Sequence, residues 1–177
     1  MNELTSNFSK YLTDEELAKV APMLERLKTL DDRNEKQDSF MSFVKYVWPQ
    51  FIEGRHHKIY AQKLQDVADG KLKRLIINMP PRHTKSEFAS YLFPTWLMGR
   101  RPDLKIIQAT HTAELAVGFG RKIKNLIESE DFKDVFPSVS LATDAKASGR
   151  WSTNGGGEYY AVGVGGALAG RGADLAI

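Results

Sequence analysis

The chain has 177 residues, of which 42% are hydrophobic, and this size predicts one ordinary core with an appendage rather than two full domains. Its formal net charge is only +3, and the absence of cysteine excludes disulfide bonds and cysteine-ligated zinc. No apolar run approaches the roughly 18 residues of a membrane-spanning helix, and the acidic N-terminus is not typical of a signal peptide, so we expect a soluble intracellular protein.

The N-terminal segment has the pattern of a helical appendage. Thr13 and Glu16 have the spacing of a capping box, and apolar residues follow at helical intervals. Pro22 is expected to kink or divide this helix. The polar stretch at residues 31–37 is typical of a linker. We therefore predict an appendage over residues 1–36 and an α/β domain over residues 37–177.

Two further helices are predicted at the start of the α/β domain. The first covers residues 39–47 and ends before Trp48, because a residue that precedes proline avoids the helical region. The second covers residues 57–68 and ends at Asp69-Gly70, where glycine is a common C-terminal signal.

The most informative segment comes next. Residues 75–77 are a short apolar run typical of a buried strand, and a helical pattern begins at Ser86. Between them lies the octet MPPRHTKS, residues 79–86. The first N–H groups of a helix have no intrahelical partner, and together with the helix dipole they form an anion site. The strand, loop and helix order therefore predicts a phosphate-binding loop for a nucleoside triphosphate.

Some residues of this 79–86 loop fit phosphate binding, and two depart from the usual pattern. Lys85 is predicted to contact the β- and γ-phosphates, and the Ser86 hydroxyl to ligate a bridging Mg²⁺. Met79 and Thr84 occupy the two positions where the usual phosphate-loop pattern has glycine. Glycine allows close approach to phosphate and positive φ, so Thr84 predicts an altered loop path or a weaker site. The alternative is a basic turn between a strand and a helix.

The other loop residues have secondary roles in this hypothesis. Arg82 is a candidate for a bidentate contact with the γ-phosphate, and a surface ion pair is its alternative. Pro81 stiffens the loop, and His83 is a spacer rather than a catalyst. Residues 71–101 hold seven basic and one acidic side chain, so the local potential favours phosphate, although a solvated basic face is an equal alternative.

The remainder of the chain alternates between strand and helix patterns. A parallel, doubly wound sheet is therefore expected. Pro94 is predicted to break or kink the helix that follows the loop. Glycines and aromatic residues between 151 and 164 indicate an antiparallel hairpin or short strands. The predicted helices are 86–92 and 112–129, and the predicted strands are 104–109 and 173–177.

Several segments, in order, resemble the ATPase domain of the large terminase subunit, the DNA-packaging motor of tailed bacteriophages. The similarity covers roughly residues 40 to 177. The matching blocks are FVKYVWP at 43–49, HHK at 56–58, GKLKRLIINMPPRHTKS at 70–86, ATH at 109–111 and GVGGALAGRGADL at 163–175.

The resemblance implies a P-loop NTPase fold of the ASCE type, with a parallel sheet flanked by helices. It implies ATP and Mg²⁺ as cofactors, and a motor that couples ATP hydrolysis to movement of DNA into a procapsid. The implied partners are double-stranded DNA, a portal protein, the small terminase subunit and further copies of the chain. The implied location is the cytoplasm of an infected bacterial host, transiently on the procapsid.

The resemblance also indicates that the ATPase domain is incomplete. In the family, the strand that resembles residues 173–177 delivers the Walker B carboxylate, and the catalytic acid follows it. Asp174 stands too early for either role, and the nuclease domain of large terminases is missing. We therefore expect an N-terminal fragment that binds nucleotide weakly and hydrolyses little ATP.

Three more residues gain a role from the resemblance. It allows Arg121 to reach the ATP of a neighbouring subunit, although a solvated helix arginine is an equal alternative. Trp48 and His57, with the nearby His56, lie where related proteins contact adenine, and core packing is the alternative for Trp48. Two rivals remain at this point, a helicase-like P-loop ATPase and an interaction module that does not hydrolyse ATP.

Overall fold

The computed structural model describes residues 13–143, 147–168 and 170–177. The first twelve residues of the predicted appendage therefore lie outside the described residues. Contacts divide the chain into two compact units, Met1–Glu35 and Lys36–Ile177. None of the described helices combines the length and the hydropathy that crossing a bilayer requires.

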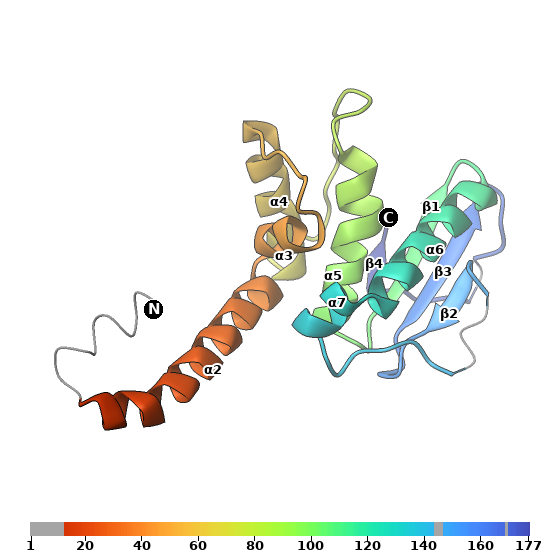
Figure 1. Cartoon of the computed structure of the whole chain (residues 1–177). Helices are drawn as coiled ribbons and strands as arrows, with labels where there is room; N and C mark the ends of the chain where they lie inside the picture. The colour runs from red at the N-terminus through yellow and green to blue at the C-terminus, as the bar shows by residue number, and fades with distance from the viewer. Residues whose placement is uncertain (1–12, 144–146, 169) are drawn as a thin grey trace. The chain divides into compact units, whose positions relative to one another are not determined.

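The first unit consists, where it is described, of the long helix α2, Asp14–Asp38, which continues into the second unit (Figure 1). The capping box is confirmed, because the Thr13 N–H and hydroxyl donate to Glu16 Oε2 at 2.9 and 2.8 Å. Pro22 lies inside the helix and does not divide it. The predicted linker at 31–37 is also wrong. Its residues are polar but include neither glycine nor proline, so they can continue a helix.

Helices α3, Phe40–Val47, and α4, Arg55–Ala68, begin the second unit. The Ser39 side chain caps α3 by accepting from the Ser42 N–H at 3.2 Å. Both predicted helices are confirmed, although α4 begins two residues earlier than predicted. Gly70 after α4 has φ of +73°, which is the left-handed conformation expected after a helix.

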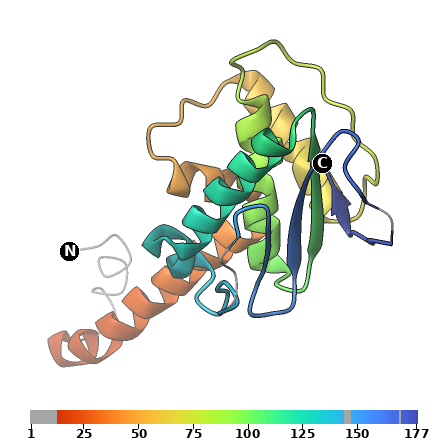
Figure 2. The same ribbon diagram turned by 90° about the vertical axis from the view of Figure 1, so that its right-hand side faces the viewer.

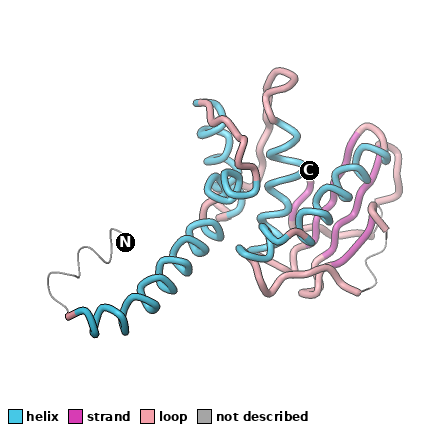
Figure 3. The backbone as a smooth tube through the Cα atoms, viewed as in Figure 1, coloured by secondary structure: helices cyan, strands magenta, loops and turns pink. Residues whose placement is uncertain are grey.

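The predicted strand at residues 75–77 is wrong, because this segment pairs with no strand in the part of the chain that the structure describes. The apolar pattern reflects one-sided packing instead. Leu75 and Ile77 pack against the core, whereas Ile76 is 88% exposed. A strand needs a ladder partner as well as apolar residues. Figure 3 shows residues 71–84 as a loop that leads into the next helix.

A continuous helical segment follows the loop. It begins at Lys85, passes through the π-helix η1, Glu87–Leu92, and ends with α5, Phe93–Arg100. The break predicted at Pro94 does not occur. Proline is tolerated in the first turn of a helix, and the π-turn has already interrupted the α-helical ladder just before α5.

The sheet is mixed rather than purely parallel. Its four strands are β1, Lys105–Thr110, β2, Arg150–Ser152, β3, Glu158–Gly163, and β4, Leu175–Ala176, in the order β2-β3-β1-β4. Strand β1 is parallel to β3 and β4, whereas β2 and β3 form the predicted antiparallel hairpin.

Helix α6, Ala113–Glu128, lies along one face of this sheet, and the short α7, Glu130–Val135, follows it (Figures 1 and 2). The buried Tyr159 of β3 donates its hydroxyl proton to the Ala116 carbonyl at 3.1 Å. Gly120 allows this close packing, because an added Cβ would lie 2.7 Å from the Tyr159 ring. The core therefore lies between α6, the sheet and helices α3 to α5.

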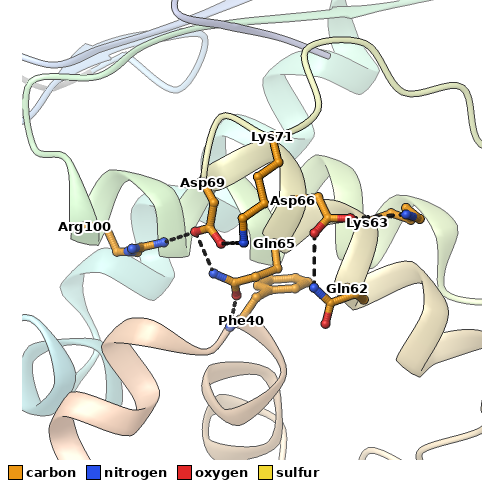
Figure 4. Close-up of polar contacts among 8 residues, drawn as sticks. All are labelled: Phe40, Gln62, Lys63, Gln65, Asp66, Asp69, Lys71 and Arg100. Atoms are coloured by element: carbon orange, nitrogen blue, oxygen red, sulfur yellow. Dashed lines mark hydrogen bonds and ion pairs between the residues drawn. The ribbon is translucent and has the colours of Figure 1, made fainter.

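A polar network fixes the C-terminal end of α4 (Figure 4). The Asp69 carboxylate accepts from Gln65 at 3.1 Å and from Lys71 at 3.2 Å, and pairs with Arg100 of α5 at 3.5 Å. Gln65 Oε1 also accepts from the Phe40 N–H of α3 at 3.0 Å. Desolvation opposes ionisation of Asp69, but these donors and cations outweigh it and hold its pKa below the ordinary value. The network therefore joins α4 to both α3 and α5.

Candidate functional site

The 79–86 loop has an unusual backbone. Arg82 and Thr84 have φ values of +61° and +59°, and they are the non-glycine residues with positive φ in the described ranges. Thr84 occupies a position where the phosphate-loop pattern has glycine. A β-branched residue at positive φ is a conformational outlier, and such strain gathers at functional sites. The loop therefore adopts at Thr84 the left-handed conformation that glycine adopts freely.

Thr84→Gly is consequently expected to stabilise the fold. Removal of the strained left-handed threonine should raise the free energy of unfolding by about 1–2 kcal/mol. The greater freedom of glycine in the unfolded chain offsets about half of this gain, so the net increase is about 0.5–1 kcal/mol. Denaturant unfolding measures the difference. His83→Gly is the control, because His83 has no positive φ, and it should be slightly destabilising. Equal destabilisation by both variants would contradict the strained loop.

The loop ends in a free helix N-terminus. The first ladder bond runs from the Phe88 N–H to the Thr84 carbonyl at 2.9 Å, so the N–H groups of residues 85–87 precede the ladder. The side chains of Lys85 and Ser86 are exposed, and neither makes a hydrogen bond or ion pair with another described residue. This end of the helix therefore offers backbone N–H groups, one ammonium and one hydroxyl together.

Other charges lie close to this helix end. Pro81, Arg82 and His83 are all exposed. Glu87 is paired with Lys122 of α6 at 2.8 Å, which places α6 beside the first turns of the helix. Arg121 of α6 is exposed and makes no ion pair among the described residues. The residues of the 79–86 loop thus lie together at the helix start. Among the described residues, Arg121 makes no contact with this loop that would place it in the same site.

The start of α4 lies beside the loop. The rings of His56 and His83 have centroids 5.7 Å apart, and His83 Nδ1 lies 2.8 Å from the Pro81 carbonyl oxygen. His56 is exposed. Of the residues predicted to contact a base, His56 therefore presents a ring next to the loop.

His57 and Trp48 serve in packing in this structure. His57 is only 7% exposed, with Phe51 at 4.8 Å between ring centroids, and its Nδ1 accepts from the Gly54 N–H at 2.9 Å. Burial, together with the smaller electrostatic effect of the neighbouring His56, holds the pKa of His57 below its ordinary value. Trp48 is half-buried and packs on Phe51 at 5.2 Å.

The Asp174 carboxylate is engaged at the start of the sheet. Asp174 accepts from the Lys105 N–H, the first of β1, at 2.9 Å, so it caps the start of that strand. Among the residues that the structure describes, no group of three or more His, Asp or Glu is arranged to hold a metal ion.

Two hollows lie elsewhere in the second unit. One of about 420 Å³ is lined by residues of α3 and α4, together with Asp38, Ser39 and Glu53. Another of about 280 Å³ lies over the sheet and includes Lys105, Arg150 and Arg171. Neither includes a residue of the 79–86 loop. Most residues of the 79–86 loop are exposed, and only Met79 and Thr84 are half-buried.

The structure adds one residue that the sequence pattern did not indicate. The hydroxyl of Tyr60 in α4 donates to the Lys85 carbonyl oxygen at 2.8 Å, and Tyr60 is only 5% exposed. Tyr60 stands three residues after His57, on the same face of the helix. That spacing was the available signal, but it did not identify the partner.

A scan of protein-family models, a search of curated proteins and a search of solved structures find no match to this chain.

Proposed function

We propose that the 79–86 loop binds the phosphates of a nucleotide and that the second unit belongs to the P-loop NTPase fold. The backbone of the loop and the start of the following helix support this proposal. The loop places a left-handed residue at the glycine position, directly before a helix whose first N–H groups, Lys85 ammonium and Ser86 hydroxyl have no partner among the described residues. Basic turns of other kinds have no need for such backbone strain.

The chemistry of each group follows from its place. The N–H groups at the helix start bind phosphate oxygens, and Lys85 neutralises charge on the β- and γ-phosphates. The Ser86 hydroxyl supplies one ligand to a Mg²⁺ held mainly by the phosphates and water. Arg82 provides a second cation at the same loop, and the exposed ring of His56 offers a surface for the base.

We further propose, on the resemblance in the sequence blocks, that the chain is the ATP-binding part of a viral DNA-packaging motor, a terminase large subunit. In the complete motor, ATP hydrolysis would drive DNA into a procapsid, with a portal protein, a small terminase subunit and further copies as partners. Arg121 would then act on a neighbouring subunit's ATP. We expect slow hydrolysis by this chain, because Glu87, the carboxylate nearest the loop in sequence, is paired with Lys122.

Titration calorimetry with ATP tests the nucleotide proposal. Binding is expected in the presence of Mg²⁺ and should weaken about tenfold when EDTA removes it, because the bridging cation no longer offsets the phosphate charge. Ser86→Ala should reduce this dependence on Mg²⁺. If the titration shows no heat of binding at millimolar MgATP, and MgATP displaces no fluorescent ATP analogue from the chain, the proposed nucleotide site is excluded.

A further inference from the structure

The helix that carries Lys85 and Ser86 is a π-helix in its second turn. In η1 the Phe93 N–H bonds the Phe88 carbonyl, five residues back. A regular α-helix would instead pair the Ala89 N–H with the Lys85 carbonyl. Sharp departures of this kind have a local cause, such as a side chain inserted into the ladder.

Tyr60 supplies that cause. Its hydroxyl donates to the Lys85 carbonyl oxygen at 2.8 Å, and it lies beside the Ala89 N–H, whose backbone lowers the pKa of Tyr60 against the larger effect of burial. These are the two backbone groups that an α-helix would join directly. The Tyr60 hydroxyl therefore lies at the hydrogen-bond ladder of the loop helix and satisfies the Lys85 carbonyl oxygen.

The position of Tyr60 is fixed on both sides. Its ring stacks on Phe88 with centroids 5.4 Å apart and an interplanar angle of 25°, and Phe88 is fully buried. Helix α4 is tied to α5 by the ion pair between Asp69 and Arg100. Burial raises the pKa of Tyr60, so its hydroxyl keeps its proton and remains a donor.

The π-turn lies between the loop residues and the body of the helix. Removal of the inserted hydroxyl allows the Ala89 N–H to approach the Lys85 carbonyl and close an α-turn. Loss of one π-turn changes the rotation of the helix start by about one residue, or about 100°. Lys85 and Ser86 would then point in a different direction relative to the loop.

We propose that Tyr60 is a positioning residue of the phosphate site. It holds the first turn of the loop helix in the π-helical arrangement that directs Lys85 and Ser86 toward a bound phosphate. This role rests on the proposed function, since it requires that the loop binds nucleotide. Because Tyr60 also stacks on Phe88, changes in the packing of Phe88 should reach the loop through α4.

Tyr60→Phe in the full chain tests this role, because it removes the hydroxyl and keeps the ring. The dissociation constant for MgATP is expected to rise about 3- to 10-fold, as one net hydrogen bond converts to that range. Backbone amide signals should change over residues 85–93, with Ala89 affected most. Tyr159→Phe is the matched control, because it removes a buried hydroxyl that donates to a helix carbonyl away from the loop.

The outcomes separate the two proposals. Weaker MgATP binding by Tyr60→Phe, with unchanged binding by Tyr159→Phe, supports the positioning role. Equal affinity of wild type and Tyr60→Phe overturns the positioning role and leaves the nucleotide site in place. Equal weakening by both variants also overturns it, since a general loss of stability would then explain the effect. If wild type binds no nucleotide, the proposed function fails and the positioning role fails with it.

Discussion

Lys85→Ala is expected to weaken MgATP binding by about 10- to 150-fold, which corresponds to the 1.5–3 kcal/mol typical of a hydrogen bond to a charged group. The Lys85 side chain is exposed and has no partner among the described residues, so its loss costs the fold little. We expect the free energy of unfolding to change by no more than about 0.5 kcal/mol. Calorimetry and denaturant unfolding of the same preparation measure both quantities.

Lys63→Ala is the control for net charge. Lys63 is an exposed lysine of α4 that pairs with Asp66 at 3.2 Å, outside the loop. The two variants change the formal charge equally, but only Lys85→Ala should affect nucleotide binding. Similar losses in both variants would mean that general electrostatic attraction, rather than the loop, supplies the affinity.

Phe88→Ala is expected to have the largest effect on stability, a loss of about 3–5 kcal/mol. Phe88 is fully buried and packs against Phe40, Phe51 and Tyr60, with ring centroids 5.4 to 5.6 Å apart. The substitution leaves a cavity where α3, α4 and the loop helix meet. Denaturant unfolding measures the loss, and nucleotide affinity should fall as well because Tyr60 loses its stacking partner.

Phe88→Leu distinguishes the contribution of buried volume to stability from that of the aromatic ring contacts. It keeps most of the buried apolar volume and loses the aromatic pairs, so we expect a loss of about 1–1.5 kcal/mol. A loss below about 1 kcal/mol for Phe88→Ala would contradict the central position of this ring in the core.

Local signals in the sequence predicted much of the fold. The ends of α3 and α4 followed from Pro49 and from Asp69-Gly70, and the span of α6 followed from apolar periodicity. Ser39 and Thr112 cap α3 and α6 in the structure. The hairpin of β2 and β3 followed from glycines and aromatic residues between 151 and 164. In each case, the residues that determine the element lie within it or next to it.

The wrong predictions have different physical causes. Residues 75–77 have a strand-like composition, but a strand also requires a neighbour, which no local pattern reveals. At residues 31–37 polarity was mistaken for a linker, although nothing in the segment stops a helix. The break expected at Pro94 did not allow for the π-turn at Glu87–Leu92, which we attribute to the contact of Tyr60 with the Lys85 carbonyl.

The features of the candidate site also differ in how far the sequence could predict them. The change from loop to helix could be predicted from contiguous residues, because the expected start at Ser86 lies one residue from the observed start at Lys85. The positive φ of Thr84 runs against the preference of threonine, so the sequence indicated only an altered loop. The burial of His57 against Phe51 and the insertion of Tyr60 depend on how α4 packs, and tertiary contacts of this kind have no local signature.

Backbone amide shifts on titration with MgATP show which residues of the chain bind the nucleotide. Nucleotide binding at the 79–86 loop predicts that the largest and saturable shifts occur at residues 84–87, around the free N–H groups of the helix start, and that Lys85→Ala reduces these shifts. Largest shifts at the hollow that includes Lys105, Arg150 and Arg171, or no saturable shift at the loop, would contradict it.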